Sequence, residues 1–200
     1  MDLFNTNSVQ NILPFEGDVL NYGLVLDSNL STHCFNKFLE ADFWEHDELI
    51  MFGKHLKTNR KVAWFGDQDY QYSYSNSIKK ALKWTTELIY LKEIVELKTG
   101  EKFNSCLLNL YNNGNEGMGW HSDNEKELGE QPVIASLSLG AARKFLLKHN
   151  QTKQKIAIIL ESGSLLLMKG ETQEKWIHSL PKTKIIQKPR INLTFRFIHS

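Results

Sequence analysis

Two histidines and one aspartate in the second half of the chain are residue types that bind transition metals. His121 and Asp123 are separated by one residue, and His178 follows much later. Residues i and i+2 of a strand point to the same face, so His121 and Asp123 could reach one ion. Two imidazoles and a carboxylate that leave positions open favour Fe(II), although zinc accepts the same ligands. The alternative is a fortuitous tripeptide and a histidine that is an ordinary core residue.

A second set of polar side chains lies on the last strand that the sequence predicts, residues 190–196. Four polar residues alternate there with apolar ones and so share one face: Arg190, Asn192, Thr194 and Arg196. Buried arginines are costly unless they are paired, and this region has few acidic residues. A dicarboxylate could satisfy both guanidinium groups through charge-assisted hydrogen bonds. Asn109 and Tyr111 add two polar groups on one face of an earlier strand.

The elements that must position these residues change in type along the chain. Two helices are expected early, at residues 31–40 with Ser31 as N-cap and from about residue 77 to 98, ended by Gly100. Residues 1–21 are expected to be irregular. Short strands are expected at residues 24–26, 106–111, 133–139, 144–147, 156–160, 165–168, 185–187 and 191–197. This pattern predicts an α+β fold, with a jelly-roll core of two sheets and the two N-terminal helices packed on one of them.

Composition narrows the class of protein further. The 200 residues, 41% of them hydrophobic, suit one domain or one domain with an extension, and the net charge of +1 indicates no class of partner. Residues 148–200 hold ten Lys or Arg against three Glu, which predicts either phosphate contacts or a solvated basic surface. Cys34 and Cys106 form no C-x-x-C pair, so we expect free thiols in a reducing, cytoplasmic setting. We expect neither a signal peptide nor a membrane span, and the protein is expected to be a monomer.

At this point the residues match a known family. From about Asn104 to Arg196, the chain resembles the AlkB-like Fe(II)/2-oxoglutarate dioxygenases, and most of all their duplex-DNA alkylation-repair branch. The motifs are Asn109-Leu-Tyr111, His121-Ser-Asp123, Ser136-Leu-Ser-Leu-Gly140, Gly163-Ser-Leu-Leu-Leu-Met168, Trp176-Ile-His-Ser-Leu-Pro181 and Pro189-Arg-Ile-Asn-Leu-Thr-Phe-Arg196. The resemblance implies one domain over residues 1–200. In it, residues 1–101 form an extension with a nucleotide-recognition lid, and residues 102–200 form the double-stranded β-helix (jelly-roll) core.

The resemblance also implies roles for these residues. His121, Asp123 and His178 would bind Fe(II). Arg190 would hold the distal carboxylate of 2-oxoglutarate, with Tyr111 and Thr194 assisting and Asn192 nearby, while Arg196 and Asn109 would lie near its other end. The implied reaction is oxidative demethylation of N-alkylated DNA bases of the 1-methyladenine and 3-methylcytosine type. It would consume O2 and 2-oxoglutarate and release succinate, CO2 and formaldehyde. The same chemistry on RNA or on a protein side chain, or a non-catalytic jelly-roll binding module, are the alternatives.

The expected substrate contacts come from three segments. A base must leave the stack to reach a buried iron. Residues Met51 to Lys54 resemble the finger hairpin of the repair branch, in which Phe52 would be the wedge, beside Gly53 and Lys54. Stacking or base recognition is expected from Tyr72, Ser73, Tyr74, Asn124 and Glu125. Phosphate contacts are expected from Lys182, Lys184 and Lys188, together with Lys54, Lys57, Arg60 and Lys61.

Each substrate contact has a structural alternative. The alternating Tyr70, Tyr72 and Tyr74 could be one face of a strand. Phe52 could be a core residue, and the lysines could be only solubilising. Two departures from the family pattern affect lesion choice: Asn124 follows the metal aspartate where relatives often carry a second acid, and Trp64 lies in a variable lid region. The expected compartment is the cytoplasm, or the nucleus in a eukaryote.

Overall fold

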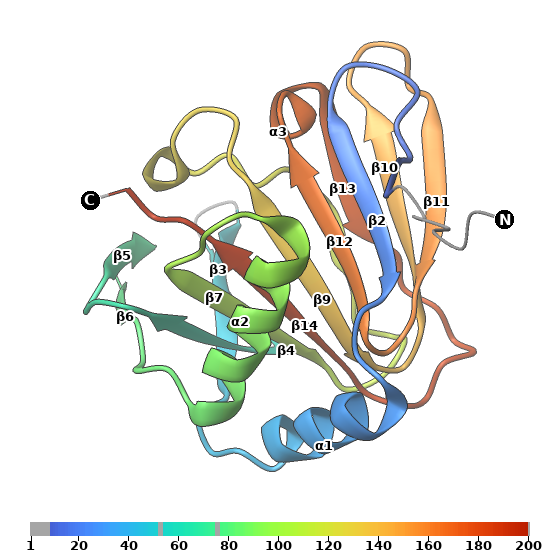
Figure 1. Ribbon diagram of the computed structural model, residues 1–200. Helices are drawn as coiled ribbons and strands as arrows, with labels where there is room; N and C mark the ends of the chain where they lie inside the picture. Colours follow the sequence, from blue (N-terminus) through green and yellow to red (C-terminus); the bar gives the residue numbers. More distant parts are fainter. Residues whose placement is uncertain (1–8, 52–53, 75–76, 200) are drawn as a thin grey trace, which may run out of the picture.

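The computed structural model describes residues 9–51, 54–74 and 77–199, and its core consists of two antiparallel sheets that face each other (Figure 1). Within these residues the larger sheet has the order β1-β2-β12-β9-β14-β7-β4-β3, and the smaller has the order β11-β10-β13-β8. The larger sheet contains β1 (Gln10–Asn11), β2 (Asp18–Leu24), β3 (Glu45–Met51), β4 (Lys54–Gly66), β7 (Ser105–Tyr111), β9 (Ile134–Gly140), β12 (Ser164–Lys169) and β14 (Arg190–Arg196). The smaller contains β8 (Met118–His121), β10 (Arg143–His149), β11 (Lys155–Leu160) and β13 (Trp176–Leu180).

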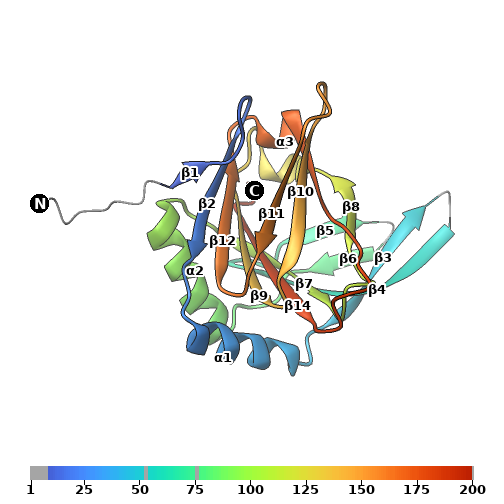
Figure 2. The same cartoon turned by 90° about the vertical axis from the view of Figure 1, so that its right-hand side faces the viewer.

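Two helices cover the outer face of the larger sheet. They are α1 (Ser28–Leu39) and α2 (Thr86–Thr99), and Figures 1 and 2 show both on that side of the molecule. Leu88, Leu91 and Val95 of α2 are fully buried in the same apolar cluster as the helix-facing residues of β7, β9 and β14. Burial of this stripe is the main free-energy gain of docking the helix. The predicted α+β jelly-roll with two N-terminal helices on one sheet is confirmed.

The helix boundaries differ from the predicted ones. α1 begins at Ser28 because Asp27, rather than Ser31, is the N-cap, and its carboxylate accepts the Leu30 N–H at 2.8 Å. The second helix does not begin near residue 77. Residues 77–80 form β6 (Ser77–Lys80), paired with β5 (Gln71–Tyr74), and α2 starts only after the Thr85 N-cap. Gly100 ends α2 in the left-handed conformation, as predicted.

The strand predictions were right for the core and wrong at the margins. Residues 1–21 were expected to be irregular, yet Asp18–Leu24 pairs along β12, and Gln10–Asn11 pairs with it. Residues 185–187 lie in a loop that joins β13 to β14, not in a strand. The β3–β4 hairpin projects from the sandwich at the end near β8 (Figure 2), and residues 52–53 lie outside the described residues.

The interior is divided into two apolar clusters. One lies between the helices and the larger sheet, and the other lies between the two sheets. Trp176, Ile134 and Leu147 are fully buried in the second cluster. Polar residues replace apolar ones at one end of the gap between the sheets, and this end holds the candidate site. None of the helices in the described part of the chain is long and apolar enough to cross a membrane.

Candidate metal and anion-binding site

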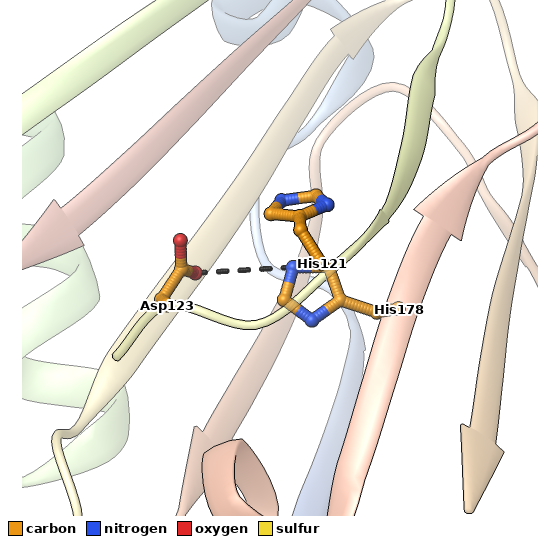
Figure 3. A group of neighbouring side chains, drawn as sticks. All are labelled: His121, Asp123 and His178. Atoms are coloured by element: carbon orange, nitrogen blue, oxygen red, sulfur yellow. Dashed lines mark ion pairs between the residues drawn. The ribbon is translucent and has the colours of Figure 1, made fainter. Parts of the chain in front are cut away.

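Three possible metal ligands converge from the smaller sheet and the coil that follows it. His121 ends β8 and lies directly opposite His178 of β13 in the strand register. Ligand atoms of His121, Asp123 and His178 all lie within 4.8 Å of one another. Figure 3 shows the Asp123 carboxylate turned toward the His178 ring, with 3.9 Å between Asp123 Oδ2 and His178 Nε2. The two-residue spacing brings His121 and Asp123 together, but Asp123 lies in the coil beyond β8 instead of on the expected strand.

Hydrogen bonds fix the orientation of these ligands. The His121 Nδ1 lies 2.9 Å from the carbonyl oxygen of Gly119. A carbonyl only accepts, so Nδ1 carries the proton and Nε2 keeps its lone pair for a metal. The Asp123 backbone N–H donates to the side-chain oxygen of Gln173 at 2.9 Å, and the Arg196 guanidinium donates to Asp123 Oδ1 at 2.5 Å.

The charges around the ligands favour binding of a cation. Burial acts to raise the pKa of Asp123, but Arg196, His178 and His121 outweigh it, and the pKa is lowered. Burial lowers the pKa of His178 to about 4, although Asp123 opposes the shift. Near neutral pH the aspartate is therefore charged and His178 is neutral, the states that a metal requires. Two imidazoles and one carboxylate fit Fe(II) with positions left open.

Arg190 is a buried cation without an ionic partner. Its side chain is 2% exposed, and its guanidinium donates to Ser138 Oγ at 2.9 Å and to Asn192 Oδ1 at 2.7 Å. Among the described residues no carboxylate pairs with it, and its Nε has no hydrogen-bond partner. Burial lowers its pKa to about 10, so the group still carries its charge. A buried, hydrogen-bonded cation that lacks a counter-ion fits one carboxylate of 2-oxoglutarate.

Arg196 has a different environment, although it shares a strand face with Arg190. It pairs with Asp123, and its second amino group lies 3.5 Å from Glu125. Few acidic residues lie near these arginines in the sequence. Both partners of Arg196 lie some 70 positions away along the chain, and the fold brings them to β14. Its predicted place near the other end of 2-oxoglutarate remains a proposal.

One cavity of about 1350 Å³ between the sheets brings the predicted residues together. All nine predicted metal and cofactor residues line it: His121, Asp123, His178, Asn109, Tyr111, Arg190, Asn192, Thr194 and Arg196. The register of β14 against β7 sets Arg190 opposite Tyr111 and Asn192 opposite Asn109. The guanidinium carbon (Cζ) of Arg190 lies 5.8 Å from the centre of the Tyr111 ring.

The predicted substrate residues are only partly described. Glu125 lines the cavity, and Asn124 is exposed beside it. Lys182, Lys184 and Lys188 are exposed on the loop between β13 and β14. Phe52 and Gly53 lie outside the described residues, and for Lys54, Tyr72, Ser73 and Tyr74 only the strands that carry them are described.

The structure contradicts one expected phosphate contact. Arg60 was grouped with the surface lysines, but it is 8% exposed and lines the cavity. Its guanidinium donates to Asn109 Oδ1 at 2.5 Å. Lys57, three residues earlier, is exposed at the cavity mouth, and Lys61 is half-buried. The buried position of Arg60 was not predicted because the basic residues from Lys54 to Lys61 were taken as one exposed surface. Alternate residues of a strand face opposite sides of the sheet, so they cannot all be exposed on one face.

Three further residues support the site, and no role was predicted for any of them, although Ser136 and Ser138 lie in one of the family motifs. Ser138 accepts from Arg190, and Ser136 donates to Asn192 at 2.9 Å. The alternation of Ser136 and Ser138 with leucines in an otherwise apolar strand was a usable signal for both. Gln173 lies in the four-residue helix α3 (Thr172–Lys175), and no sequence pattern connects it with Asp123.

Gln173→Ala is expected to weaken Fe(II) binding by about 10–100-fold, the usual effect of losing a group that orients a ligand. The change removes the acceptor of the buried Asp123 N–H and so loosens the coil that carries the carboxylate. The measurement is the dissociation constant for Fe(II) under anaerobic conditions. Glu174→Ala is the matched control, because the Glu174 side chain is 66% exposed on the same short helix. Equal affinity in both variants would show that Gln173 does not position the ligand.

Comparisons with known proteins agree with this geometry. A family model described as the 2OG-Fe(II) oxygenase superfamily matches residues 19–196. Alpha-ketoglutarate-dependent dioxygenase alkB homolog 3 of Bos taurus is 40% identical over 149 residues, which are 70% of this chain and 52% of that protein. DNA oxidative demethylase ALKBH2 of Homo sapiens is 38% identical over 156 residues, 74% of this chain and 60% of that protein. The chain thus spans about half the length of the curated relatives it matches.

A solved structure, described as the structure of OsALKBH1, shares the fold. It superposes with a TM-score of 0.64 at 16% sequence identity and covers 94% of this chain and 100% of that one. At this identity the likeness concerns the arrangement of the sheets and helices.

Proposed function

The chain belongs to the 2OG-Fe(II) oxygenase superfamily, and from this membership we propose that it oxidatively demethylates N-alkylated bases of DNA, using Fe(II), O2 and 2-oxoglutarate. One observation carries the proposal: the two-histidine, one-aspartate set and the uncompensated Arg190 line the same cavity. A cation site and an anion site in one cavity suit an iron and a dicarboxylate bound together. The names of the two relatives, a dioxygenase and a DNA oxidative demethylase, support the same reading.

The bound iron and 2-oxoglutarate would supply O2 activation, so that an N-methyl base, 2-oxoglutarate and O2 become the free base, formaldehyde, succinate and CO2. The protein's own residues bind and orient. Arg190, hydrogen-bonded to Ser138 and Asn192, offers its remaining N–H groups to the distal carboxylate, and Tyr111 and Thr194 border the same space. Arg196 neutralises Asp123 on the side away from the histidines and keeps the carboxylate aimed at the metal position.

The rest of the cavity has room and polar groups for a base. About 1350 Å³ is more than a small co-substrate needs, since pockets for drug-sized ligands are about 300–1,000 Å³. Glu125 Oε2 is buried without a hydrogen-bond partner among the described residues, which suits an acceptor for the exocyclic amine of a base. Trp64, stacked on Tyr70 at 6.3 Å between ring centres, lines the side opposite the metal ligands.

We propose further that residues 1–101 act as a nucleotide-recognition extension on a core formed by residues 102–200. Phe43, Trp44, Lys57 and Trp64 from the extension line the cavity, which supports this division. The strands β2 and β4 are part of the larger sheet, which supports a single domain made of the extension and the core. The enzyme is expected to act as a monomer in the compartment that holds its DNA, the cytoplasm or a eukaryotic nucleus.

The test is formaldehyde and succinate release from oligonucleotides that carry one 1-methyladenine or 3-methylcytosine. Single-stranded DNA, duplex DNA and RNA of the same sequence should be compared, with reactions that lack Fe(II) or 2-oxoglutarate as controls. Equimolar formaldehyde and repaired base are expected from DNA. Higher turnover on RNA would change the substrate but keep the chemistry, and no formaldehyde from any of them would refute the proposal. Anaerobic Fe(II) with 2-oxoglutarate should also give a weak visible charge-transfer band, whose absence would favour a non-catalytic binding module.

Phe52→Ala is expected to lower kcat/KM on duplex substrate by at least about tenfold and to leave single-stranded substrate nearly unchanged. The expectation comes from the resemblance of residues 51–54 to the finger hairpin, in which an apolar wedge fills the gap left by a flipped base at a cost of a few kcal/mol of unstacking. Phe52→Leu, which keeps an apolar wedge, is the control and should retain most of the duplex activity. An equal loss on both substrates would contradict the wedge role.

A further inference from the structure

The outer face of the smaller sheet is basic and lacks acidic residues on its strands. The four strands β8, β10, β11 and β13 contain no Asp or Glu. Their alternation turns Lys144 and Lys148 of β10 and Lys155 of β11 away from the gap between the sheets. Lys148 lies opposite Lys155 in the register, so two cations adjoin without a carboxylate between them. Both described long helices pack on the other sheet, and none covers this face (Figures 1 and 2).

An exposed tryptophan lies on the same face. Trp120 precedes the metal ligand His121 on β8, so its ring points to the opposite side of the sheet from the metal site. It is 39% exposed, although tryptophan is among the most apolar side chains. The Lys148 ammonium lies 4.4 Å from the centre of its ring. A cation held over an aromatic ring that is itself open to solvent is the arrangement that receives a base and its phosphate.

A hollow beside Trp120 connects this face to the loop between β13 and β14. It has a volume of about 280 Å³ and is lined by Trp120, Leu146, Ser179, Pro181 and Lys182, with Gly117 and Gly119 beside them. Gly119 has open space where a side chain would be, so a ligand can approach the backbone of β8 there. β8 is an edge strand of its sheet, and no described strand pairs with its free side.

We propose that Trp120, Lys148 and Lys182 form a second nucleotide site, which holds the single-stranded stretch of nucleic acid next to the alkylated base. In this arrangement the strand leaves the cavity across the edge of β8. One flanking base stacks on Trp120, and the adjoining phosphates meet Lys148 and Lys182. The choice of nucleic acid as the ligand rests on the proposed function. Trp120 and His121 are consecutive residues, so a nucleic-acid strand with its alkylated base at the metal site would pass close to Trp120.

Charge and stacking together select nucleic acid as the occupant. Three lysines on the strands and Lys182 on the loop, with no acid on those strands, complement a polyanion. An acidic protein segment could pair with the lysines, but its carboxylates would not stack on the exposed ring of Trp120 beside the hollow. A flanking nucleotide uses both features, since every base has a π face and every linkage a phosphate.

The first test is binding of an unmodified 12-nucleotide single strand, which requires neither iron nor turnover. Trp120→Ala is expected to weaken binding by about tenfold or more, within the range for loss of one base–aromatic stack. Lys148→Ala is expected to weaken it less and to reduce the slope of log K against log salt by about 0.7, the value for one lost phosphate contact on a single strand. Lys98→Ala on α2, an exposed lysine on the opposite side of the molecule, is the matched control and should change nothing.

The second test locates the contact on the unaltered protein and so does not depend on the folding of a variant. Single strands with 5-iodouracil at successive positions from the methylated base are irradiated, and the crosslinked peptides are identified by mass spectrometry. The inference requires an adduct on Trp120 from one or two positions beside the lesion. Adducts confined to other residues, or wild-type binding by Trp120→Ala, would overturn it. So would a polyglutamate that competes as well as the oligonucleotide, because the face would then be a general polyanion surface.

The two proposals can fail separately. Binding that depends on Trp120, without any formaldehyde release, would refute the demethylase proposal and support the nucleotide site. Formaldehyde release with strand binding that is indifferent to Trp120 and Lys148 would refute the nucleotide site and leave the demethylase proposal intact.

Discussion

Asp123→Ala is expected to abolish formaldehyde release, a loss of at least about a thousandfold. The change removes one of three metal ligands and also leaves the half-enclosed Arg196 without its closest carboxylate. Removing one member of a buried ion pair costs about 3–5 kcal/mol in itself. Turnover, Fe(II) affinity and the thermal midpoint of the variant should therefore all fall. The measurement is formaldehyde released per enzyme at saturating Fe(II), alongside the dissociation constant for the metal.

Glu130→Ala provides the control for Asp123→Ala. It removes a carboxylate from the same stretch of chain, but Glu130 is exposed. This variant should match the wild type in metal affinity and turnover. If Asp123→Ala binds Fe(II) as tightly as the control does, Asp123 is not a ligand, and the metal position must be sought elsewhere in the cavity.

Arg190→Met is expected to raise the KM for 2-oxoglutarate by at least about a hundredfold and to leave Fe(II) affinity nearly unchanged. Arg190 is the buried cation that lacks a carboxylate partner among the described residues, and the proposed partner is a carboxylate of the co-substrate. Truncating one member of a buried, hydrogen-bonded charge pair costs about 2–5 kcal/mol. Methionine keeps much of the volume and removes the charge. The measurement is the initial rate against 2-oxoglutarate concentration.

Arg190→Lys separates charge from geometry in the same experiment. A lysine keeps the charge but not the planar group that donates to Ser138 and Asn192 and faces a carboxylate with two N–H groups. Its KM should lie between those of the wild type and the methionine variant. An unchanged KM in both variants would exclude Arg190 as the carboxylate partner and make Arg196 the next candidate.

The grouping of the candidate site residues could be predicted because most of them carry local signals. His121 and Asp123 are close in the sequence, and the alternation from Arg190 to Arg196 marks one face of one strand. The jelly-roll followed from short apolar runs separated by turn residues. These signals depend on residues a few positions apart in the sequence. Such residues stay close in space whatever the order of the strands in the sheets.

What the sequence did not predict depends on contacts that are distant along the chain. The ion pair between Arg196 and Asp123 joins residues 73 positions apart, and the hydrogen bond from Arg60 to Asn109 joins residues 49 apart. β2 was overlooked because its own residue pattern does not indicate a strand. Residues 18–24 are a strand because they pair with β12. Residues 77–80 have helix-like spacing, but pairing with β5 overrides it. Register and pairing are properties of the assembled sheets.

The two halves of the site belong to different sheets. The histidines lie on β8 and β13 of the smaller sheet, where Phe145 packs 5.4 Å from the His178 ring, whereas Arg190 lies on β14 of the larger sheet. Facing sheets are held about 10 Å apart by the side chains between them. The apolar side chains between the sheets therefore set the distance between the proposed iron site and Arg190, and so the length of the co-substrate that could contact both. A diacid one methylene shorter or longer than 2-oxoglutarate would meet only one of its two anchors, so discrimination among diacids would reside in the hydrophobic core.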